Sequence, residues 1–312
     1  MEIQHLIQLL INGLVDGTKI ALLAASFGLI ISITRRFHVA YISTYVLAVY
    51  TAIFFVRTFY LIVPIAVIIG LAVGTALGVL LELIVYRPIS RRAERTGNDP
   101  LIPVFIASLG VTVVVQNALS IGFNTQPLPL EVIPPAGVLI GEVNFTNLDV
   151  VTVIVGIVII GALQYFLTRT RWGRWIGGVR VNPTMAASVG INTGRMFLLV
   201  FAIGSLVSGI LGMIDATNTA ASPGMGFDRV FYGFVVAALA GASASPVKLA
   251  VYGVAIGEVA SLSALFIAPA WSVLVVFSIL LIYVAVRAVQ VVAPSVRARF
   301  APSPAAPGGA SS

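Results

Sequence analysis

The chain contains no cysteine and very few charged residues. Among its 312 residues, 18 are Lys or Arg and 11 are Asp or Glu, so only 9% are charged, against about 25% in an average globular protein. The lack of cysteine excludes disulfides, thiolate metal sites and a cysteine nucleophile. So few charges could not cover the surface of a compact domain of this length, which argues against a soluble enzyme and against a disordered chain.

Several motifs of catalysis and metal binding are also missing. The sequence has no G-x-x-x-x-G-K-[ST], so it does not bind ATP through a P-loop, and it has no G-x-S-x-G nucleophile elbow. Its two histidines, His5 and His38, are too few for a multi-histidine metal site. No pair of a base and a nucleophile can be assembled, so we predict no catalytic residues, no metal and no cofactor bound by the chain itself.

Most of the chain is apolar. Hydrophobic residues make up 59% of it, and the mean hydropathy is +1.07. A membrane-spanning helix needs roughly 20 mainly apolar residues, and lipid offers backbone N–H and C=O groups no hydrogen-bond partner. We therefore predict an all-α membrane protein, a polytopic helical bundle of eight or nine membrane segments. These segments are expected near 6–33, 38–56, 59–86, 101–121, 149–168, 196–216, 230–245, 247–268 and 271–292.

Some of the segments are expected to be broken or re-entrant. The stretch 217–226 carries Gly and Pro, and Ser245 is followed by Pro246, so both places are expected breaks between helices. The last residues read APSPAAPGGASS, a composition typical of a disordered end. We accordingly predict one transmembrane domain, 1–293, followed by a disordered C-terminal tail, 294–312.

The formal net charge is +7, which in a soluble protein would suggest a nucleic-acid partner. Here the basic residues concentrate at 87–99, at 169–195 and at the C-terminal end, whereas 122–148 has no Lys or Arg and contains Glu131 and Glu142. Because basic loops stay on the cytoplasmic side, the first three regions are predicted to be cytoplasmic and 122–148 to lie outside. The chain is therefore expected in the cytoplasmic (inner) membrane, without a nucleic-acid partner.

Small residues recur at four-residue spacing within two of the predicted segments. Gly70, Gly74 and Gly78 form one such row, and Ser208 and Gly212 form another. In lipid, small residues allow two helix backbones to approach closely, which replaces the hydrophobic driving force that acts in water. These five residues are predicted to pack helices, and the pattern does not distinguish a transporter from a channel.

The ionisable residues within or at the edges of the predicted segments include Asp16, Lys19, Glu82, Asp215 and Glu258. Charges at such depth are costly and usually face the interior of a bundle. Asp16 and Lys19 are three residues apart and favour a local ion pair, and Glu82 lies close enough to the cytoplasmic end to pair with a nearby arginine. Asp215 and Glu258 have no partner of opposite charge nearby in the sequence. Each could therefore either line a transport pathway or pair with a charge on another helix.

The loop 169–195 has an amphipathic beginning, Arg169-Thr-Arg-Trp-Gly-Arg-Trp175, whose tryptophans suit the membrane interface and whose arginines suit the cytoplasm. Asn182 and Pro183 then predict the start of a short helix, because Asn caps helices and Pro favours their first turn. Gly190 predicts its end. A short cytoplasmic helix can dock a partner, and a plain solvated loop is the alternative.

Several short motifs follow one another along residues 8–290. They are Asn12-Gly13-Leu14-Val15-x-Gly17, Glu82-x-x-Val85-Tyr86-Arg87-Pro88, Gly110-Val-Thr-x-x-x-Gln116-Asn117, Thr170-Arg171-x-Gly173-Arg174, Ala186-Ala187-x-x-Gly190-Ile191 and Pro223-x-Met225-Gly226. In this order and spacing they resemble the membrane-spanning permease subunit of branched-chain-amino-acid-type ABC importers, the LivH/LivM family.

Two runs depart from the pattern of that family. Where the family usually has an Asn-Phe-Ala-His-Gly-acidic run, residues 38–43 read HVAYIS, and where it has a Gly-Gly-x-Gly-Ser turn followed by Pro-Gly, residues 240–246 read AGASASP. The missing glycines remove conformational freedom that such breaks use. The resemblance implies that both regions line the pathway, so the departures bear on the substrate more than on the fold.

The resemblance implies a division of labour among several subunits. This chain would form half of a pore with a second permease subunit, identical or paralogous; two cytoplasmic ATPase subunits would bind ATP, and a soluble binding protein would deliver the solute outside. The ATPase-coupling residues would be Arg171, Gly173, Arg174, Ala186, Ala187, Gly190 and Ile191. The candidate pathway residues are His38, Tyr41, Ser43, Asn117, Asp215, Asn218 and Glu258.

The leading hypothesis is therefore import of branched-chain or other small amino acids. Within the same family, urea or short amides are the alternative substrates. A stand-alone channel or an ion-coupled carrier is the alternative of another class, and it predicts transport without an ATPase. An intramembrane enzyme is disfavoured because no catalytic constellation is present.

Overall fold

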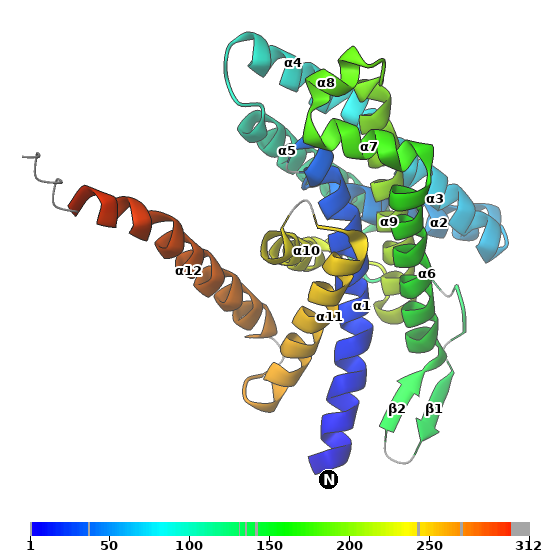
Figure 1. Ribbon diagram of the computed structural model, residues 1–312. Coiled ribbons are helices and arrows are strands. Elements are labelled where there is room, and N and C mark those ends of the chain that lie inside the picture. The colour runs from blue at the N-terminus through cyan, green and yellow to red at the C-terminus, as the bar shows by residue number, and fades with distance from the viewer. Residues whose placement is uncertain are drawn as a thin grey trace, which may run out of the picture.

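The computed structural model describes residues 2–36, 38–130, 132–134, 136–140, 143–241, 244–268 and 271–300. Its helices are α1 (Glu2–Thr34), α2 (Tyr41–Phe59), α3 (Val63–Leu80), the π-helical turn η1 (Leu81–Tyr86), α4 (Arg87–Arg95), α5 (Leu101–Phe123), α6 (Asn147–Arg169), α7 (Arg171–Val181), α8 (Pro183–Ser188), α9 (Thr193–Thr219), α10 (Phe227–Ala240), α11 (Pro246–Leu262), the 3-10 turn η2 (Ser263–Leu265) and α12 (Ser272–Phe300). All of these helices except α12, which projects outward, gather into one bundle (Figure 1).

The helical bundle predicted from the sequence is confirmed. Within the described residues, seven helices are long and apolar enough to cross a membrane, and two shorter apolar helices, Arg229–Ala240 and Ser272–Val286, accompany them. The seven long and two shorter helices together agree in number with the eight or nine membrane segments that the apolar windows predict. The chain is therefore a polytopic helical membrane protein.

Helix α1 is the centre of the bundle. It packs against α6, α9, α10 and α11 (Figure 1), and Leu22, Ala24 and Phe27 on its middle turns are fully buried. Its contact with α11 is close because glycines meet there: a Cβ added at Gly253 would collide with Ala21 of α1. Small residues thus let the two backbones touch, as packing in lipid requires.

Glycines also set the contacts of α3. A Cβ added at Gly74 would lie 2.9 Å from the carbonyl oxygen of Thr44 on α2, and one at Gly78 would collide with Ser205 of α9. Gly70 faces Ala48 of α2 in the same way. On α9, Ser208 is buried, and Gly212 lies against Tyr45 and Val49 of α2. The two rows of small residues therefore lie where α2, α3 and α9 meet.

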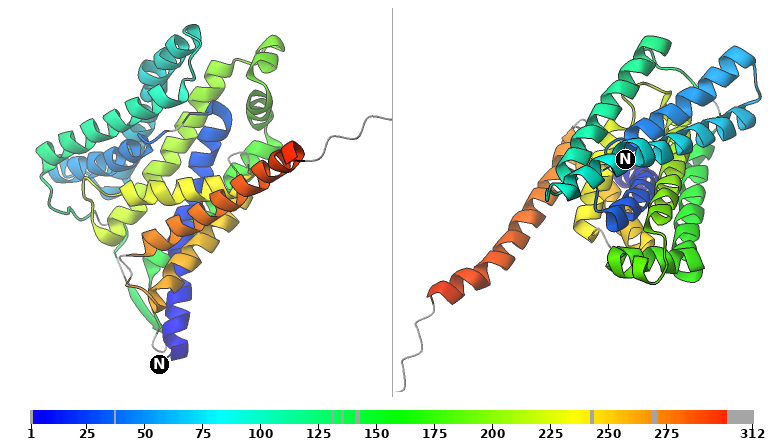
Figure 2. Two further views of the ribbon diagram at one scale, coloured as in Figure 1. Left: turned by 90° about the vertical axis from the view of Figure 1, so that its left-hand side faces the viewer. Right: turned by 90° about the horizontal axis from the view of Figure 1, so that it is seen from above.

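Both expected helix breaks are present. Helix α9 ends at Thr219, and α10 begins only at Phe227, after Gly226 in a left-handed conformation with φ of 89°. Helix α11 begins at Pro246, and the Ser245 hydroxyl accepts a hydrogen bond from the backbone N–H of Lys248. With 14 residues, α10 is about 21 Å long, shorter than the roughly 30 Å hydrocarbon core. It runs across the direction of α1 (Figure 2, left), as expected of a re-entrant segment.

Three elements differ from the sequence-based expectation. The region 122–148 contains an antiparallel hairpin, β1 (Gly137–Ile140) with β2 (Val143–Thr146), in which Gly137 pairs with Thr146; Glu131 and Glu142 of this region lie outside the described residues. The basic loop 87–99 begins with α4, which continues α3 through η1. The amphipathic start of 169–195 is the helix α7, because the Thr170 hydroxyl accepts a hydrogen bond from the backbone N–H of Gly173.

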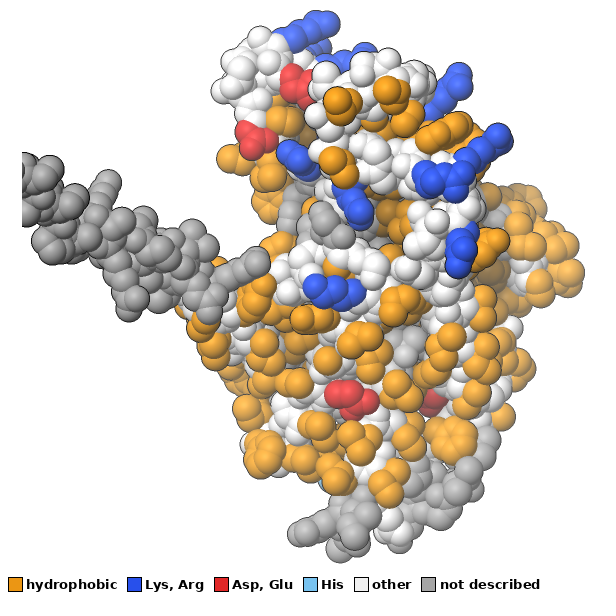
Figure 3. All heavy atoms as spheres, viewed as in Figure 1, with side chains coloured by type: hydrophobic (Ala, Val, Ile, Leu, Met, Phe, Trp, Pro, Cys, Tyr) orange, Lys and Arg blue, Asp and Glu red, His pale blue; other side chains and the backbone are white. Residues whose placement is uncertain are grey.

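The bundle has two chemically distinct ends. Helices α4, α7 and α8 form one end, where Lys and Arg side chains gather on the face that Figure 3 shows. The N-terminus and the β1–β2 hairpin lie at the opposite end (Figure 1). Helix α12 extends away from the bundle (Figures 1 and 2) and reaches Phe300, past the predicted domain boundary at 293. The remainder of the predicted tail, 301–312, lies outside the described residues.

Candidate functional site

Four charged side chains from three helices form a closed ring within the bundle. The Lys19 ammonium lies 3.4 Å from Oδ1 of Asp16 and 3.5 Å from Oδ1 of Asp215. The Arg229 guanidinium lies 3.4 Å from Oδ1 of Asp16 and 3.4 Å from Oδ2 of Asp215. Cations and anions alternate around this charge ring, so that each charge has two opposite neighbours and the formal sum is zero.

The local structure of three helices brings the charge ring together. Asp16 and Lys19 are three residues apart, near the middle of α1, and so share one face. Asp215 is on the last turns of α9, before the break, and Arg229 is on the first turn of α10, after it. The break therefore returns the chain to the level of Asp215. Tyr45 of α2 donates its hydroxyl hydrogen to Oδ2 of Asp215.

The charge ring has a sealed half and an open half. The side chains of Lys19 and Asp215 are only 7% and 6% exposed, whereas those of Arg229 and Asp16 are 27% and 51% exposed. A cavity of about 250 Å³ lies beside the open half and is lined by both Asp16 and Arg229. Its other walls include Asn12, Tyr232 and Ser261. Charges at membrane depth usually face the bundle interior or a cavity, and this pair borders a cavity.

A second network of charges lies near the other end of α1. Nη1 of Arg36 donates to Oε2 of Glu82 on η1 at 2.6 Å, and the Glu82 side chain is fully buried. Arg87 is 3.8 Å from the same carboxylate, and its Nη2 donates to the carbonyl oxygen of Gly194 at the start of α9. The expected pairing of Glu82 with an arginine is present, but the shorter contact comes from Arg36.

The residues around His38 form a buried polar and aromatic cluster. His38 Nδ1 and the Tyr86 hydroxyl share a hydrogen bond of 2.7 Å, and the imidazole ring packs edge-on against Phe201. Tyr41 shares a hydrogen bond with Ser26 through their hydroxyls. His38, Tyr41 and Ser43 are all fully buried, and Ser43 Oγ has no hydrogen-bond partner among the described residues. The divergent run 38–43 is thus part of the core.

The other candidate pathway residues do not join these two groups. Asn117 is exposed on α5, where its amide donates to the carbonyl oxygen of Val113. Asn218 lines a separate, mainly apolar cavity of about 220 Å³ beside Val67 and Ile214. Glu258 of α11 lies against Gly13 of α1, and its buried Oε2 has no hydrogen-bond partner among the described residues. The structure therefore divides the candidate pathway residues among several places.

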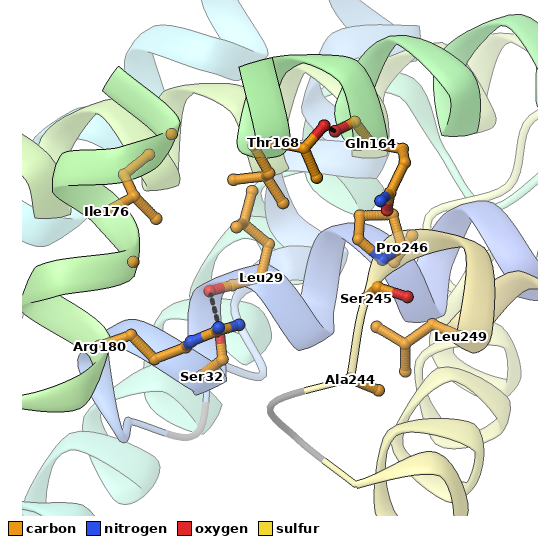
Figure 4. A pocket seen from close by; sticks show the side chains of 14 residues that line it. Leu29, Ser32, Gln164, Thr168, Ile176, Arg180, Ala244, Ser245, Pro246 and Leu249 are labelled. Carbon is orange, nitrogen blue, oxygen red and sulfur yellow. Dashed lines mark hydrogen bonds between the residues drawn. The ribbon is translucent and has the colours of Figure 1, made fainter. Parts of the chain in front are cut away.

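A further cavity of about 190 Å³ lies between α1, α6, α7 and the start of α11 (Figure 4). Arg180 reaches into it from α7 toward Ser32, whose hydroxyl donates to the carbonyl oxygen of Leu29 at 3.0 Å. Ser245 and Pro246 stand on the facing wall. This cavity includes the proline of the divergent run 240–246; Ala242 and Ser243 of that run lie outside the described residues.

The candidate ATPase-coupling residues lie on α7, α8 and the turn that follows. Asn182 Oδ1 accepts a hydrogen bond from the backbone N–H of Met185 at 3.0 Å, which caps α8 as predicted. Gly190 follows the helix in a left-handed conformation with φ of 87°. Gly173 and Ala186 are buried, whereas Arg171, Arg174 and Ala187 are exposed. Ile191 lines a cavity of about 320 Å³ with Trp172, Trp175 and Arg195.

Sequence reasoning did not find three members of these networks. Arg229 was overlooked because it stands at the edge of an apolar window, next to the break, and Tyr45 because tyrosine is common in apolar helices. Arg36 has no acidic residue close to it in the sequence that would signal its pairing. A search of every predicted segment edge for single charges would have found Arg229, because such charges are rare and usually paired.

A helical bundle that holds paired charges and polar cavities between its membrane helices has the construction of a membrane transport protein. Within the described residues, no group of His, Cys, Asp and Glu could hold a metal ion. The chain belongs to the family described as "Branched-chain amino acid transport system / permease component", whose model matches residues 9–285. It is thus an ABC transporter permease component, a transport subunit without a catalytic site of its own.

Curated relatives match over most of the chain. The high-affinity branched-chain amino acid transport system permease protein BraD of Pseudomonas aeruginosa is 23% identical over 259 residues, covering 78% of this chain and 82% of BraD. The corresponding LivH of Salmonella typhimurium is 23% identical over 292 residues, covering 89% and 92%. A chain of the solved structure PsaBC from Streptococcus pneumoniae in complex with Fab aligns with a TM-score of 0.47 at 18% identity, covering 87% and 89%.

Proposed function

We propose that this chain is the membrane-spanning subunit of an ATP-driven importer that translocates branched-chain or other small amino acids delivered by a soluble binding protein. The observation that carries the proposal is the family match, which spans residues 9–285 and so includes every membrane helix except the first turns of α1 and the end of α12. BraD and LivH, which align over most of their length, are named as permeases for branched-chain amino acids.

The partners follow from what the chain lacks. It has no P-loop, so the ATP would bind to two cytoplasmic ATPase subunits, which we place against α7 and α8. A second permease subunit, identical or paralogous, would complete the pore. The exposed residues of α8, Ala187 among them, and the cavity beside Trp172 and Ile191 support this placement, because a helix end and an apolar hollow on a basic surface suit a docking partner.

The proposal is tested by uptake into proteoliposomes that contain the complete importer. The chain is purified with its partner permease, its ATPase subunits and the binding protein, and ATP is enclosed on the ATPase side. We expect accumulation of radiolabelled leucine, isoleucine or valine that needs both ATP and the binding protein. Accumulation of urea or acetamide but of no amino acid would assign the importer to the other substrate class of the family.

The coupling surface is tested with Ala187→Asp in the same assay. A buried carboxylate at the ATPase contact should abolish uptake and its linked ATP hydrolysis, since an unpaired charge in an interface is strongly unfavourable. Ala136→Asp is the matched control, because Ala136 is also exposed but lies beside the hairpin at the opposite end. Unchanged coupled hydrolysis in Ala187→Asp would refute this docking surface.

An ion-coupled carrier is the second candidate, and Glu258 is the observation that favours it. Its buried Oε2 lacks a hydrogen-bond partner among the described residues, as expected of a carboxyl group that binds a proton or a cation. That function predicts solute uptake by this chain without ATPase subunits, driven by a proton or sodium gradient and lost in Glu258→Gln. Gradient-driven uptake without ATP would replace the importer proposal.

A further inference from the structure

We propose that the open half of the charge ring, Asp16 and Arg229, binds the ammonium and carboxylate groups of a zwitterionic amino acid that inserts between these two side chains. The inference rests on the proposed function and gives it a site. Its first support is the asymmetry of the charge ring. Lys19 and Asp215 are sealed in the core, whereas Asp16 and Arg229 both border the 250 Å³ cavity.

The contact between Asp16 and Arg229 is the exposed one of the four long contacts in the charge ring, which measure 3.4–3.5 Å. Nη1 of Arg229 is 3.4 Å from Oδ1 of Asp16, whereas a strong charge-assisted hydrogen bond measures about 2.7–2.9 Å. Each of the two side chains also keeps a second partner of opposite charge, Lys19 for Asp16 and Asp215 for Arg229. The charge ring can therefore open at this one edge while neither charge is left without a counter-charge.

The chemistry of the opened edge matches both ends of an α-amino acid. A guanidinium presents a planar fork of N–H donors that fits a carboxylate with two parallel hydrogen bonds. An aspartate is an acceptor and suits an ammonium group with its several donors. Nε of Arg229 contacts Asp215. The two Nη nitrogens are therefore the ones that would donate to the carboxylate of the ligand.

The zero net charge of the ring selects the charge of the ligand. A lone anion or cation would leave one unit of charge uncompensated within the bundle, which is expensive away from water. A zwitterion adds one charge of each sign and restores alternation around the enlarged ring. Uncharged urea would bind weakly here. The Asp16–Arg229 pair would have to separate, and urea would supply no charge to replace either partner.

The walls of the cavity define the side chain of the ligand. Leu9, Ile20 and Ala260 give it an apolar part, and Asn12 and Ser261 add polar groups beside Asp16. Ser261 is fixed because its hydroxyl donates to the carbonyl oxygen of Leu9 at 2.6 Å. At about 250 Å³, the cavity is smaller than the roughly 300–1,000 Å³ of sites for drug-sized ligands. A small neutral amino acid with an aliphatic side chain is the ligand class that fits.

The experiment measures binding to the purified permease complex, without ATP or the binding protein. The probes are L-leucine, L-leucinamide, which lacks the carboxylate, and 4-methylpentanoate, which lacks the ammonium group. The variants are Asp16→Asn, Arg229→Gln and the double variant Asp16→Asn/Arg229→Gln. The matched controls Glu94→Gln and Arg57→Gln remove the same charges at exposed positions that do not line the cavity.

The double variant separates binding from folding. Each single variant leaves the charge ring with a net charge and is expected to assemble poorly, whereas the double variant is neutral and should assemble like the controls. We expect it to bind leucine about tenfold to a hundredfold more weakly than the wild type, as the loss of charge-assisted hydrogen bonds implies. The two leucine analogues should bind the wild type more weakly by a similar factor.

Two binding results would overturn the inference. One is an assembled double variant that binds leucine as the wild type does, and the other is a wild type that binds leucine no better than the analogues. ATP-driven uptake is read separately in proteoliposomes. If the double variant loses leucine binding and the wild type shows no ATP-driven uptake, the importer proposal is refuted and the binding site stands. If the double variant keeps ATP-driven uptake, the binding site is refuted and the importer proposal stands.

Discussion

The buried ion pair between Arg36 and Glu82 has the shortest nitrogen–oxygen distance among the ion pairs of the described residues. Their side chains are 9% and 0% exposed, and the nitrogen and oxygen are 2.6 Å apart. Two charges removed from water stabilise a fold only while they stay together, because each alone would be left without solvent or counter-charge. The pair joins the end of α1 to the π-helical turn η1, so its loss would separate two elements.

We expect Glu82→Gln to destabilise the subunit strongly. Loss of the carboxylate leaves Arg36 buried without its partner, and breaking such a pair lowers the free energy of unfolding by about 3–5 kcal/mol. The neutral double variant Arg36→Met/Glu82→Leu should regain most of this loss. The measurement is the unfolding midpoint of the detergent-solubilised protein, with the exposed Glu94→Gln as control. Equal midpoints for Glu82→Gln and the control would contradict the argument.

The long apolar elements were predictable from the sequence, whereas the partners across them were not. Hydrophobicity over about 20 residues sets where a membrane helix lies, and Asn182 with Pro183 was enough to predict α8. Asp16–Lys19 and Glu82–Arg87 are local pairs. The other ion pairs of the charge ring and of Glu82 join different elements: 46 positions separate Arg36 from Glu82, and 213 separate Asp16 from Arg229. No local pattern encodes such pairs, since they depend on how the helices pack.

The hairpin and η1 escaped prediction for a different reason. Residues 137–146 are apolar but too short for a membrane helix, and they stand beside Pro and Gly, so the sequence favoured a loop. In η1 the backbone hydrogen bonds change from the α-helical to the π-helical pattern, and the side chains of the sequence give no indication of this change. Among the candidate site residues, Asp215 lies in the charge ring, whereas Asn117 is exposed.

The packing of α3 against α2 gives a prediction at the scale of the element. We expect Gly74→Ala to destabilise the bundle by about 1–3 kcal/mol, because its Cβ would stand 2.9 Å from the Thr44 carbonyl oxygen and 2.9 Å from Ala48 Cβ. Gly110→Ala on α5 is the matched control, because no atom lies within 4 Å of its added Cβ. There the alanine should stabilise the helix by about 0.5–1 kcal/mol. Unfolding midpoints that move in the same direction in both variants would refute the packing role.

At the scale of the whole molecule, charge separates the two ends of the bundle. The basic helices α4, α7 and α8 are at one end, and the hairpin is at the other (Figures 1 and 3). We propose from the positive-inside rule that the basic end is cytoplasmic, which would present α7 and α8 to the ATPase subunits and the hairpin to the binding protein.

Two single cysteines test the orientation, since the chain has no native cysteine. Ala136→Cys stands beside the hairpin, and Val181→Cys stands at the end of α7, where Val181 is 78% exposed. A membrane-impermeant maleimide added to intact cells should label the first and reach the second only after permeabilisation. Labelling of Val181→Cys alone in intact cells would reverse the arrangement.

The neutrality of the charge ring also has an electrical consequence for the proposed transport. One unit of charge that crosses a membrane does work of about 2.3 kcal/mol for each 100 mV of potential. A zwitterion carries no net charge, and the two cations and two anions of the charge ring sum to zero. The translocation step would therefore be electroneutral, so that its rate in proteoliposomes is set by ATP and is indifferent to the membrane voltage.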